Sequence, residues 1–172
     1  PTMCVFDLDP GPRTGIRECA EVALDIKDVL DRLAGLECLP KTSGSKGLQL
    51  YVPLNTPHTH EHCSEFALAV AQVLEKHHGD RVTSIMRKDL RGGKVFIDWS
   101  QNSRHKTTAA PYTLRARPHP TVSTPVTWDE VEAAADGAPL SFEAPDVLAR
   151  VENHGDLFAD VLTLGQDIPA VG

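Results

Sequence analysis

Two carboxylates close a short apolar run near the start of the chain, in Val5-Phe6-Asp7-Leu8-Asp9-Pro10. Residues i and i+2 of a strand point to the same face, so Asp7 and Asp9 are predicted to project side by side, with Phe6 and Leu8 in the core. Carboxylates this close repel each other unless a cation lies between them, so the pair indicates a metal site. The alternative is a strand that ends in an Asp-Pro-Gly turn, and the pair taken alone favours that alternative.

A third carboxylate, Asp98, closes another apolar run, Lys94-Val95-Phe96-Ile97-Asp98-Trp99. It can lie beside Asp7 and Asp9 if the two strands are neighbours. Three acids on adjacent strand ends can hold two divalent cations about 3.5–4 Å apart, which is the arrangement used in phosphoryl transfer. The alternative for Asp98 is a lone carboxylate paired with a nearby arginine.

Small residues and two lysines form a candidate phosphate-binding loop, Lys41-Thr42-Ser43-Gly44-Ser45-Lys46-Gly47. Such loops expose backbone N–H groups, and hydroxyls with a lysine add further phosphate contacts. The spacing of a Walker A loop is missing. On composition alone, a flexible connection between two strands is the commoner structure.

Arginines further along the chain extend the basic character of this candidate site. Arg115 and Arg117 share a face if residues 112–117 form a strand, and the guanidinium fork suits phosphate oxygens. The alternative is a solvated basic edge that protects a strand from pairing. Arg87, Lys88 and Arg91 belong to the same basic zone.

Histidines and cysteines give no comparable signal. His58, His60, His62 and Cys63 could form half of a zinc site, but a second half is missing, so a polar loop that leads into a helix is the better interpretation. The four cysteines contain no C-x-x-C pair and are predicted to be reduced thiols, mostly in the core, in a cytosolic protein.

Hydrophobic periodicity predicts the elements that must position these residues. Strands are expected at 3–7, 38–41, 48–53, 82–86, 94–99 and 112–117. Helices are expected at 17–33 and 61–77, with three weaker helical segments near 127–135, 144–153 and 156–164. This order predicts an α+β fold, a mainly antiparallel sheet with helices packed on one face. Residues 1–165 are predicted to form one catalytic domain and 166–172 a tail.

Charge is distributed unevenly along the 172 residues, whose net charge is −7. Residues 81–117 carry nine Lys or Arg against two Asp, whereas residues 118–172 carry one Arg against ten acids. A basic segment between acidic ones suits an anionic ligand held at one place. It does not suit a protein that coats DNA along its whole surface. The sequence contains no apolar stretch long enough to span a membrane.

Taken together and in this order, these motifs resemble the polymerase domain of bacterial DNA ligase D, of the archaeo-eukaryotic primase superfamily. The matching segments, which cover residues 4 to about 160, are Phe6–Pro10, Pro40–Leu48, Gly93–Trp99 with Gln101-Asn102, Thr107–Tyr112 and Ser123–Glu130. The resemblance implies a primase-like catalytic palm. It also implies template-directed nucleotidyl transfer that fills gaps in non-homologous end joining, with Mn²⁺ or Mg²⁺.

By the same resemblance, Asp7, Asp9 and Asp98 would be the catalytic metal ligands. The nucleotide would be bound by Ser43, Lys46, Gln49, Arg91, Arg115 and Arg117. DNA ends or gapped DNA and nucleoside triphosphates would be substrates, Ku and a DNA ligase domain would be partners, and the protein would act at the nucleoid in the cytoplasm.

The sequence departs from the family pattern in two ways. Gln49 stands where many relatives have a phosphate-binding His, and Gln cannot carry charge, so a weaker affinity for triphosphate is expected. The family also has a DNA-grasping segment before the Asp7 strand, and the chain begins at that strand. The rival functions are therefore a nucleotide- and metal-binding fragment without polymerase activity and, less favoured, a haloacid-dehalogenase-like phosphatase with Asp7 as nucleophile.

Overall fold

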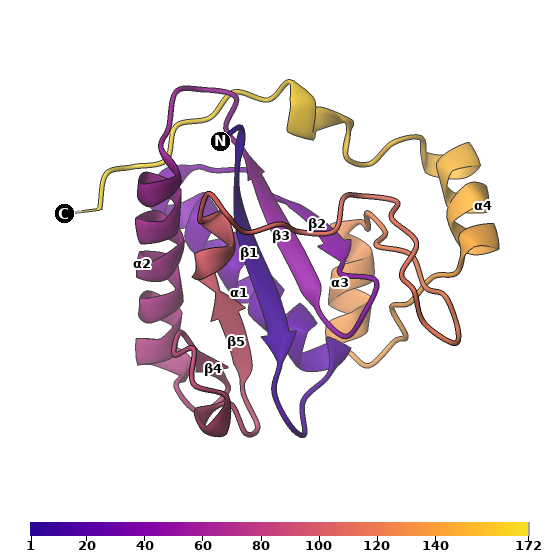
Figure 1. Cartoon of the computed structure of the whole chain (residues 1–172), viewed down its shortest axis with the longest axis horizontal. Helices are drawn as coiled ribbons and strands as arrows, with labels where there is room; N and C mark the ends of the chain where they lie inside the picture. The colour runs from indigo at the N-terminus through magenta and orange to yellow at the C-terminus, as the bar shows by residue number, and fades with distance from the viewer. Residues whose placement is uncertain (172) are drawn as a thin grey trace.

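The centre of the molecule is a five-stranded sheet of order β2-β3-β1-β5-β4 (Figure 1). The computed structural model describes residues 1–171, apart from the side chain of Leu33. The strands are β1 (Met3–Pro10), β2 (Leu39–Thr42), β3 (Leu48–Pro53), β4 (Val82–Thr83) and β5 (Val95–Asp98). All neighbours pair antiparallel except β4 and β5.

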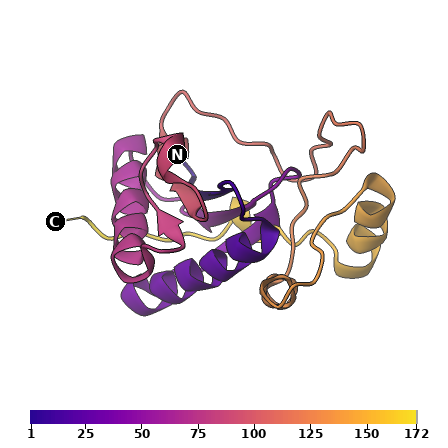
Figure 2. The ribbon, with the colours of Figure 1, turned by 90° about the horizontal axis from the view of Figure 1, so that it is seen from below.

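Two long helices, α1 (Ile16–Ala34) and α2 (His60–His78), cover one face of this sheet. In Figure 2 both lie on the same side, while the chain that follows β5 crosses over the opposite face. The shorter helices are α3 (Trp128–Ala135), α4 (Ala144–His154) and the 3-10 turns η1 (Lys88–Leu90), η2 (Trp99–Asn102) and η3 (Ala159–Leu162). The predicted α+β class is confirmed.

Strict alternation along the strands decides which side chains enter the main core. Cys4, Phe6 and Leu8 of β1 are fully buried against the helices. Their neighbours at odd positions face the other side, where Val5 packs with Tyr51 in a small second cluster. Asp7 and Asp9 therefore lie on the face that α1 and α2 leave uncovered.

Three predicted elements differ from the structure. Residues 112–117 do not form a strand, because Tyr112 adopts a left-handed backbone (φ 65°) and only a single bridge joins Leu114 to Val122. The strand predicted at 82–86 ends at Thr83, where the Glu75 carboxylate accepts hydrogen bonds from the hydroxyls of Thr83 and Ser84. These side-chain bonds compete with continued pairing. The third weak helical segment contains only η3.

The described part of the predicted tail packs against the rest of the fold. The Gln166 side-chain amide donates to the carbonyls of Glu37 and Pro53, and Ile168 is buried in the main core. Gly172 lies outside the described residues. All four cysteines are buried free thiols, of which burial raises the pKa of Cys38 to about 12. None of the helices in residues 1–171 is long and apolar enough to cross a bilayer.

Candidate active site

A row of four polar residues crosses the uncovered face of the sheet from one strand to the next. Lys41 of β2 pairs in register with Gln49 of β3, Gln49 with Asp7 of β1, and Asp7 with Asp98 of β5. Register partners on one face place their side chains next to each other. The fold therefore brings the first and third predicted acids together, although they are far apart in the sequence.

Asp7 is nearly buried, and amide groups hold both of its carboxylate oxygens. Gln49 Nε2 donates to Oδ1 and Gln101 Nε2 donates to Oδ2, each at 3.1 Å. Burial and the charge of Asp9 raise the pKa of Asp7 to about 6, against a weaker lowering by the two amides. The hydrogen bonds from the two amides thus offset only part of the cost of burying the Asp7 charge.

Asp9 and Asp98 complete the acidic group. Burial and then the charge of Asp98 raise the pKa of Asp9, while Arg91 acts in the opposite direction. Asp98 accepts hydrogen bonds from the backbone N–H and hydroxyl of Ser100 at one oxygen, and its other oxygen lies 3.4 Å from Lys106 Nζ. In residues 1–171 no three His, Cys, Asp or Glu side chains are arranged as a ready-made metal centre.

The small-residue loop borders a cavity of about 480 Å³ beside these acids. Ser43 Oγ accepts hydrogen bonds from the N–H groups of Ser45 and Gly47, which curls the loop on itself. A Cβ at position 47 would lie 1.9 Å from the Leu8 carbonyl oxygen, so only glycine lets the loop approach β1 this closely. That approach places the loop beside Asp7 and Asp9.

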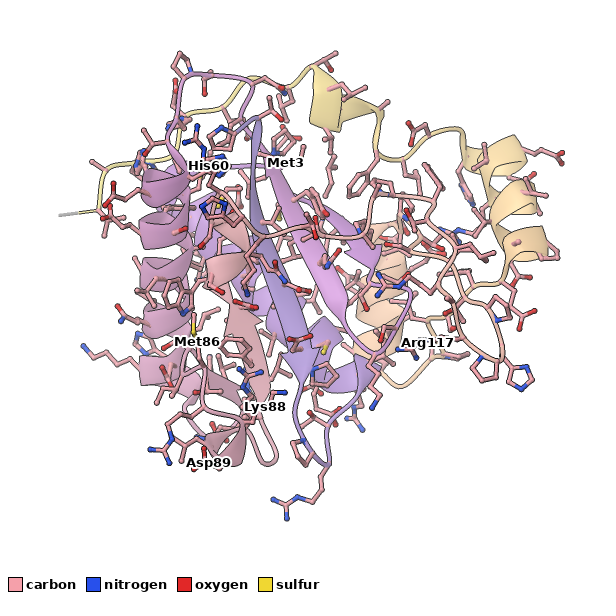
Figure 3. All side chains as sticks on the ribbon, viewed as in Figure 1. Met3, His60, Met86, Lys88, Asp89 and Arg117 are labelled. Atoms are coloured by element: carbon pink, nitrogen blue, oxygen red, sulfur yellow. The ribbon has the colours of Figure 1, made fainter. Side chains whose placement is uncertain are left out.

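Basic side chains surround the same cavity. Its lining includes Asp7, Asp9, Ser43, Lys46, Gln49, Lys88, Arg91, Gln101 and Arg115. The Arg91 guanidinium lies 3.6 Å from the centre of the Phe96 ring and donates to the Met86 carbonyl, which fixes its position at the cavity wall. Figure 3 shows Lys88 and Arg117 on either side of β1.

The structure brings most of the predicted site residues to one place. Asp98 stands next to Asp7 in register but does not itself line the cavity. Arg117 also lies outside the lining and bonds the Ser45 hydroxyl of the loop. The premise that Arg115 and Arg117 share a strand face was wrong, because their segment is irregular. Arg115 reaches the cavity from a turn tied back to Thr121.

The sequence placed Lys41 in the candidate phosphate-binding loop, but Lys41 is fully buried and does not line the cavity. Gln101 and Lys106 had no predicted role, although Gln101 bonds Asp7 and Lys106 lies beside Asp98. Gln101 and Lys106 follow β5 within eight residues of Asp98, so proximity in sequence was a usable signal. Lys41 could have been found by extending the strand register of Gln49 one strand further.

The histidines near the start of α2 have other partners. His58 Nδ1 lies 3.1 Å from His62 Nδ1, His60 Nδ1 lies 2.9 Å from the Asn102 carbonyl, and Cys63 is buried in the core. These contacts tie the start of α2 to its neighbours, as expected for a polar loop entering a helix.

Comparison with known proteins gives a consistent result. The family model "LigD, primase-polymerase domain" matches residues 1–158. The multifunctional non-homologous end joining protein LigD of Mycolicibacterium smegmatis is 48% identical over 158 residues, which are 92% of this chain and 20% of that protein. The bifunctional LigD of Bacillus subtilis is 31% identical over 170 residues, 98% of this chain and 27% of that protein.

Among solved structures, the polymerase domain of Mycobacterium tuberculosis ligase D in complex with DNA matches with a TM-score of 0.87 and 48% identity. The match covers 93% of this chain and 54% of that one. The chain thus spans about a fifth of the M. smegmatis relative and about half of the solved domain. The predicted resemblance is confirmed: the chain belongs to the LigD primase-polymerase domain family.

Proposed function

We propose that this chain is a template-directed nucleotidyltransferase that fills gaps during repair of double-strand breaks by non-homologous end joining. One observation carries the proposal: three carboxylates of β1 and β5 lie beside a cavity whose other walls are a small-residue loop and several cations. Acids on one side and cations on the other suit a reaction at a triphosphate.

The acidic group fits a pair of Mn²⁺ or Mg²⁺ ions. Asp7, Asp9 and Asp98 offer only oxygen donors, which these hard cations prefer. Burial and mutual repulsion raise the pKa of Asp7 and Asp9, so a divalent cation would relieve an existing electrostatic strain. When bound, such ions supply Lewis-acid stabilisation of the attacking and leaving oxygens.

The remaining side chains of the cavity would hold the triphosphate. Ser43 and Lys46 present a hydroxyl and an ammonium from the loop, and Arg115 approaches from the facing turn. Arg91 is held in place by Phe96 and Met86, so it loses little freedom when it meets a phosphate. Arg117 would act on the outer side of the loop through Ser45, and Gln49 would contribute a neutral amide.

The substrates would be DNA ends or gapped DNA together with nucleoside triphosphates. The solved M. tuberculosis relative is in complex with DNA, and the LigD relatives are end-joining proteins. On this basis Ku and a DNA ligase domain would be partners. A role on chromosomal DNA would place the protein in the cytoplasm, at the nucleoid.

Primer extension on gapped DNA with Mn²⁺ and nucleoside triphosphates tests the proposal. The wild type should extend the primer and Asp98→Ala should lose at least 10²-fold of that activity, because a metal ligand is removed. Asp28→Ala, at a half-exposed position on α1, is the matched control and should extend like the wild type. Equal extension by the wild type and Asp98→Ala would reject a polymerase.

The rival functions give different results in the same experiment. Manganese-dependent nucleotide binding without extension would indicate a binding fragment. Hydrolysis of a generic phosphate ester that Asp7→Asn abolishes would indicate a phosphatase.

A further inference from the structure

Lys41 is a lysine with no exposed surface, at the end of the polar row farthest from Asp98. Its ammonium lies within 4.0 Å of no carboxylate among the residues that the structure describes. Instead it donates to Gln49 Oε1 at 2.5 Å and to Ser123 Oγ at 2.6 Å. Burial lowers the pKa of Lys41 to about 7. Such a group is expensive to bury and calls for an explanation.

The contact with Lys41 decides which way the Gln49 amide points. An ammonium only donates hydrogen bonds, and an ionised carboxylate only accepts them. Because Gln49 lies between Lys41 and Asp7, its oxygen must face Lys41 and its NH₂ group must face Asp7. Without Lys41 the Gln49 oxygen loses its donor, and only the single bond to Asp7 still orients the amide.

Through Ser123, Lys41 is also connected to the segment that carries Arg115. Ser123 Oγ donates to the Thr42 carbonyl, and its backbone N–H donates to the Thr113 carbonyl. Thr42 is the last residue of β2 and is followed by Ser43 of the small-residue loop, and Thr113 lies two residues before Arg115. One buried ammonium is therefore bonded both to the support of Asp7 and to the segment that carries Arg115.

We propose that Lys41 is a positioning residue for nucleotidyl transfer, which fixes the Gln49 amide towards Asp7 and keeps the Arg115 segment in register with it. This inference rests on the proposed function. Lys41 itself does not touch the nucleotide, because it has no surface in the cavity. Its effect on the reaction passes through Gln49 and Ser123.

A double-mutant cycle between Lys41 and Gln49 tests the proposal. Lys41→Met keeps the length of the side chain and removes its donors, and Gln49→Met removes the amide. We expect Lys41→Met to lower kcat/KM for primer extension about tenfold or more. In the Gln49→Met background the same change should cost only about two- to fivefold, because the path to Asp7 is already lost and only the path through Ser123 remains. A purely structural lysine would cost the same factor in both backgrounds, and that result would overturn the proposal.

A readout independent of activity is the side-chain amide of Gln49 in ¹H–¹⁵N NMR spectra. In the wild type it should give a sharp, slowly exchanging pair of signals, and Lys41→Met should shift or broaden them. Unchanged signals in Lys41→Met would overturn the proposal even if the wild type proved inactive. If the wild type does not extend the primer but Lys41→Met still changes the Gln49 signals, only the polymerase function is rejected.

Ser123→Ala keeps the experiment decisive if Lys41→Met does not fold. It removes one of the two fixed partners of Lys41 and leaves the backbone bonds of Ser123 in place. We expect it to reduce kcat/KM about two- to fivefold and to move the Gln49 signals in the same direction. Wild-type values for both measurements would contradict the proposal.

Discussion

At the scale of single residues, Asp7 is kept as a carboxylate where a neutral group would be more stable. Burial and, second, the adjacent charge of Asp9 raise its pKa to about 6. A strongly shifted carboxyl beside a charged cavity is typical of a functional site. A buried charge that lowers stability is expected where a ligand later compensates for it.

Replacing Asp7 with Asn should therefore stabilise the protein and abolish its activity. The new side chain removes a buried charge, and its NH₂ group can donate to Gln101 Oε1, which has no hydrogen-bond partner among the described residues. We expect the free energy of unfolding at pH 8 to rise by about 1–3 kcal/mol, measured in urea. Asp28→Asn, on an exposed turn of α1, should change it by less than about 0.5 kcal/mol. If Asp7→Asn is less stable than the wild type, the hydrogen bonds from the two amides stabilise the Asp7 carboxylate by more than burial destabilises it.

The pH dependence of stability should carry the signature of the same group. The folded-state pKa of Asp7, about 6, lies above its ordinary value of 3.8. The contribution of the Asp7 carboxyl to the free energy of unfolding is thus fully present below about pH 4, and it is lost as the pH rises through 6. Between these limits the wild type should lose up to about 3 kcal/mol relative to Asp7→Asn. Urea unfolding of both proteins from pH 4 to 7 measures the difference, and parallel curves would contradict the raised pKa.

At the scale of elements, the site depends on how closely separate segments approach each other. The loop 43–47 lies against β1 only because position 47 has no side chain. On the other side, segment 122–126 pairs with the edge of β2, where Thr42 and Thr124 exchange hydrogen bonds. Arg150 of α4 binds Glu130 of α3 and the Pro125 carbonyl, which holds this segment in place.

Gly47→Ala should separate the loop from β1. The added Cβ would meet the Leu8 carbonyl oxygen at 1.9 Å, so the backbone must move. We expect a loss of about 2 kcal/mol or more in stability and at least a tenfold loss in affinity for nucleoside triphosphate with Mn²⁺. Gly15→Ala is the control, since its Cβ would meet only Glu18 at 3.9 Å. Calorimetric titration measures both variants, and unaltered binding by Gly47→Ala would show that the loop does not hold phosphate.

Local sequence patterns predicted the elements where alternation or helical spacing was strong. The observed limits differ from the expected ones by at most three residues in β1, β3, α1 and α2. The strand order does not follow from such patterns. The register that places Asp7 beside Asp98 depends on that order, so it could be read only from the structure. The strand predicted at 112–117 was wrong for another reason. The alternation of the segment is typical of a strand, but the left-handed backbone of Tyr112 turns the chain.

At the scale of the whole molecule, the basic residues are concentrated in one part of the sequence, and in the structure several of them gather around the cavity. The net charge is −7, yet the cavity is lined by Lys46, Lys88, Arg91 and Arg115. The basic segment 81–117 supplies three of these four cations, and its part that follows β5 crosses the face that α1 and α2 leave free. An acidic surface elsewhere would repel DNA, so the basic face would select the orientation in which DNA approaches.

Salt dependence of DNA binding measures how many phosphates this face neutralises. The logarithm of the binding constant should fall linearly with the logarithm of salt concentration, by about 0.9 for each phosphate contact in duplex DNA. We expect Arg104→Gln, at an exposed position on the segment over the open face, to weaken binding to gapped DNA and to reduce that slope by about 1. Lys76→Gln changes the net charge equally but lies on α2, on the opposite face, and should leave the slope unchanged. Equal slopes for the two variants would mean that net charge, and not the basic face, governs the encounter with DNA.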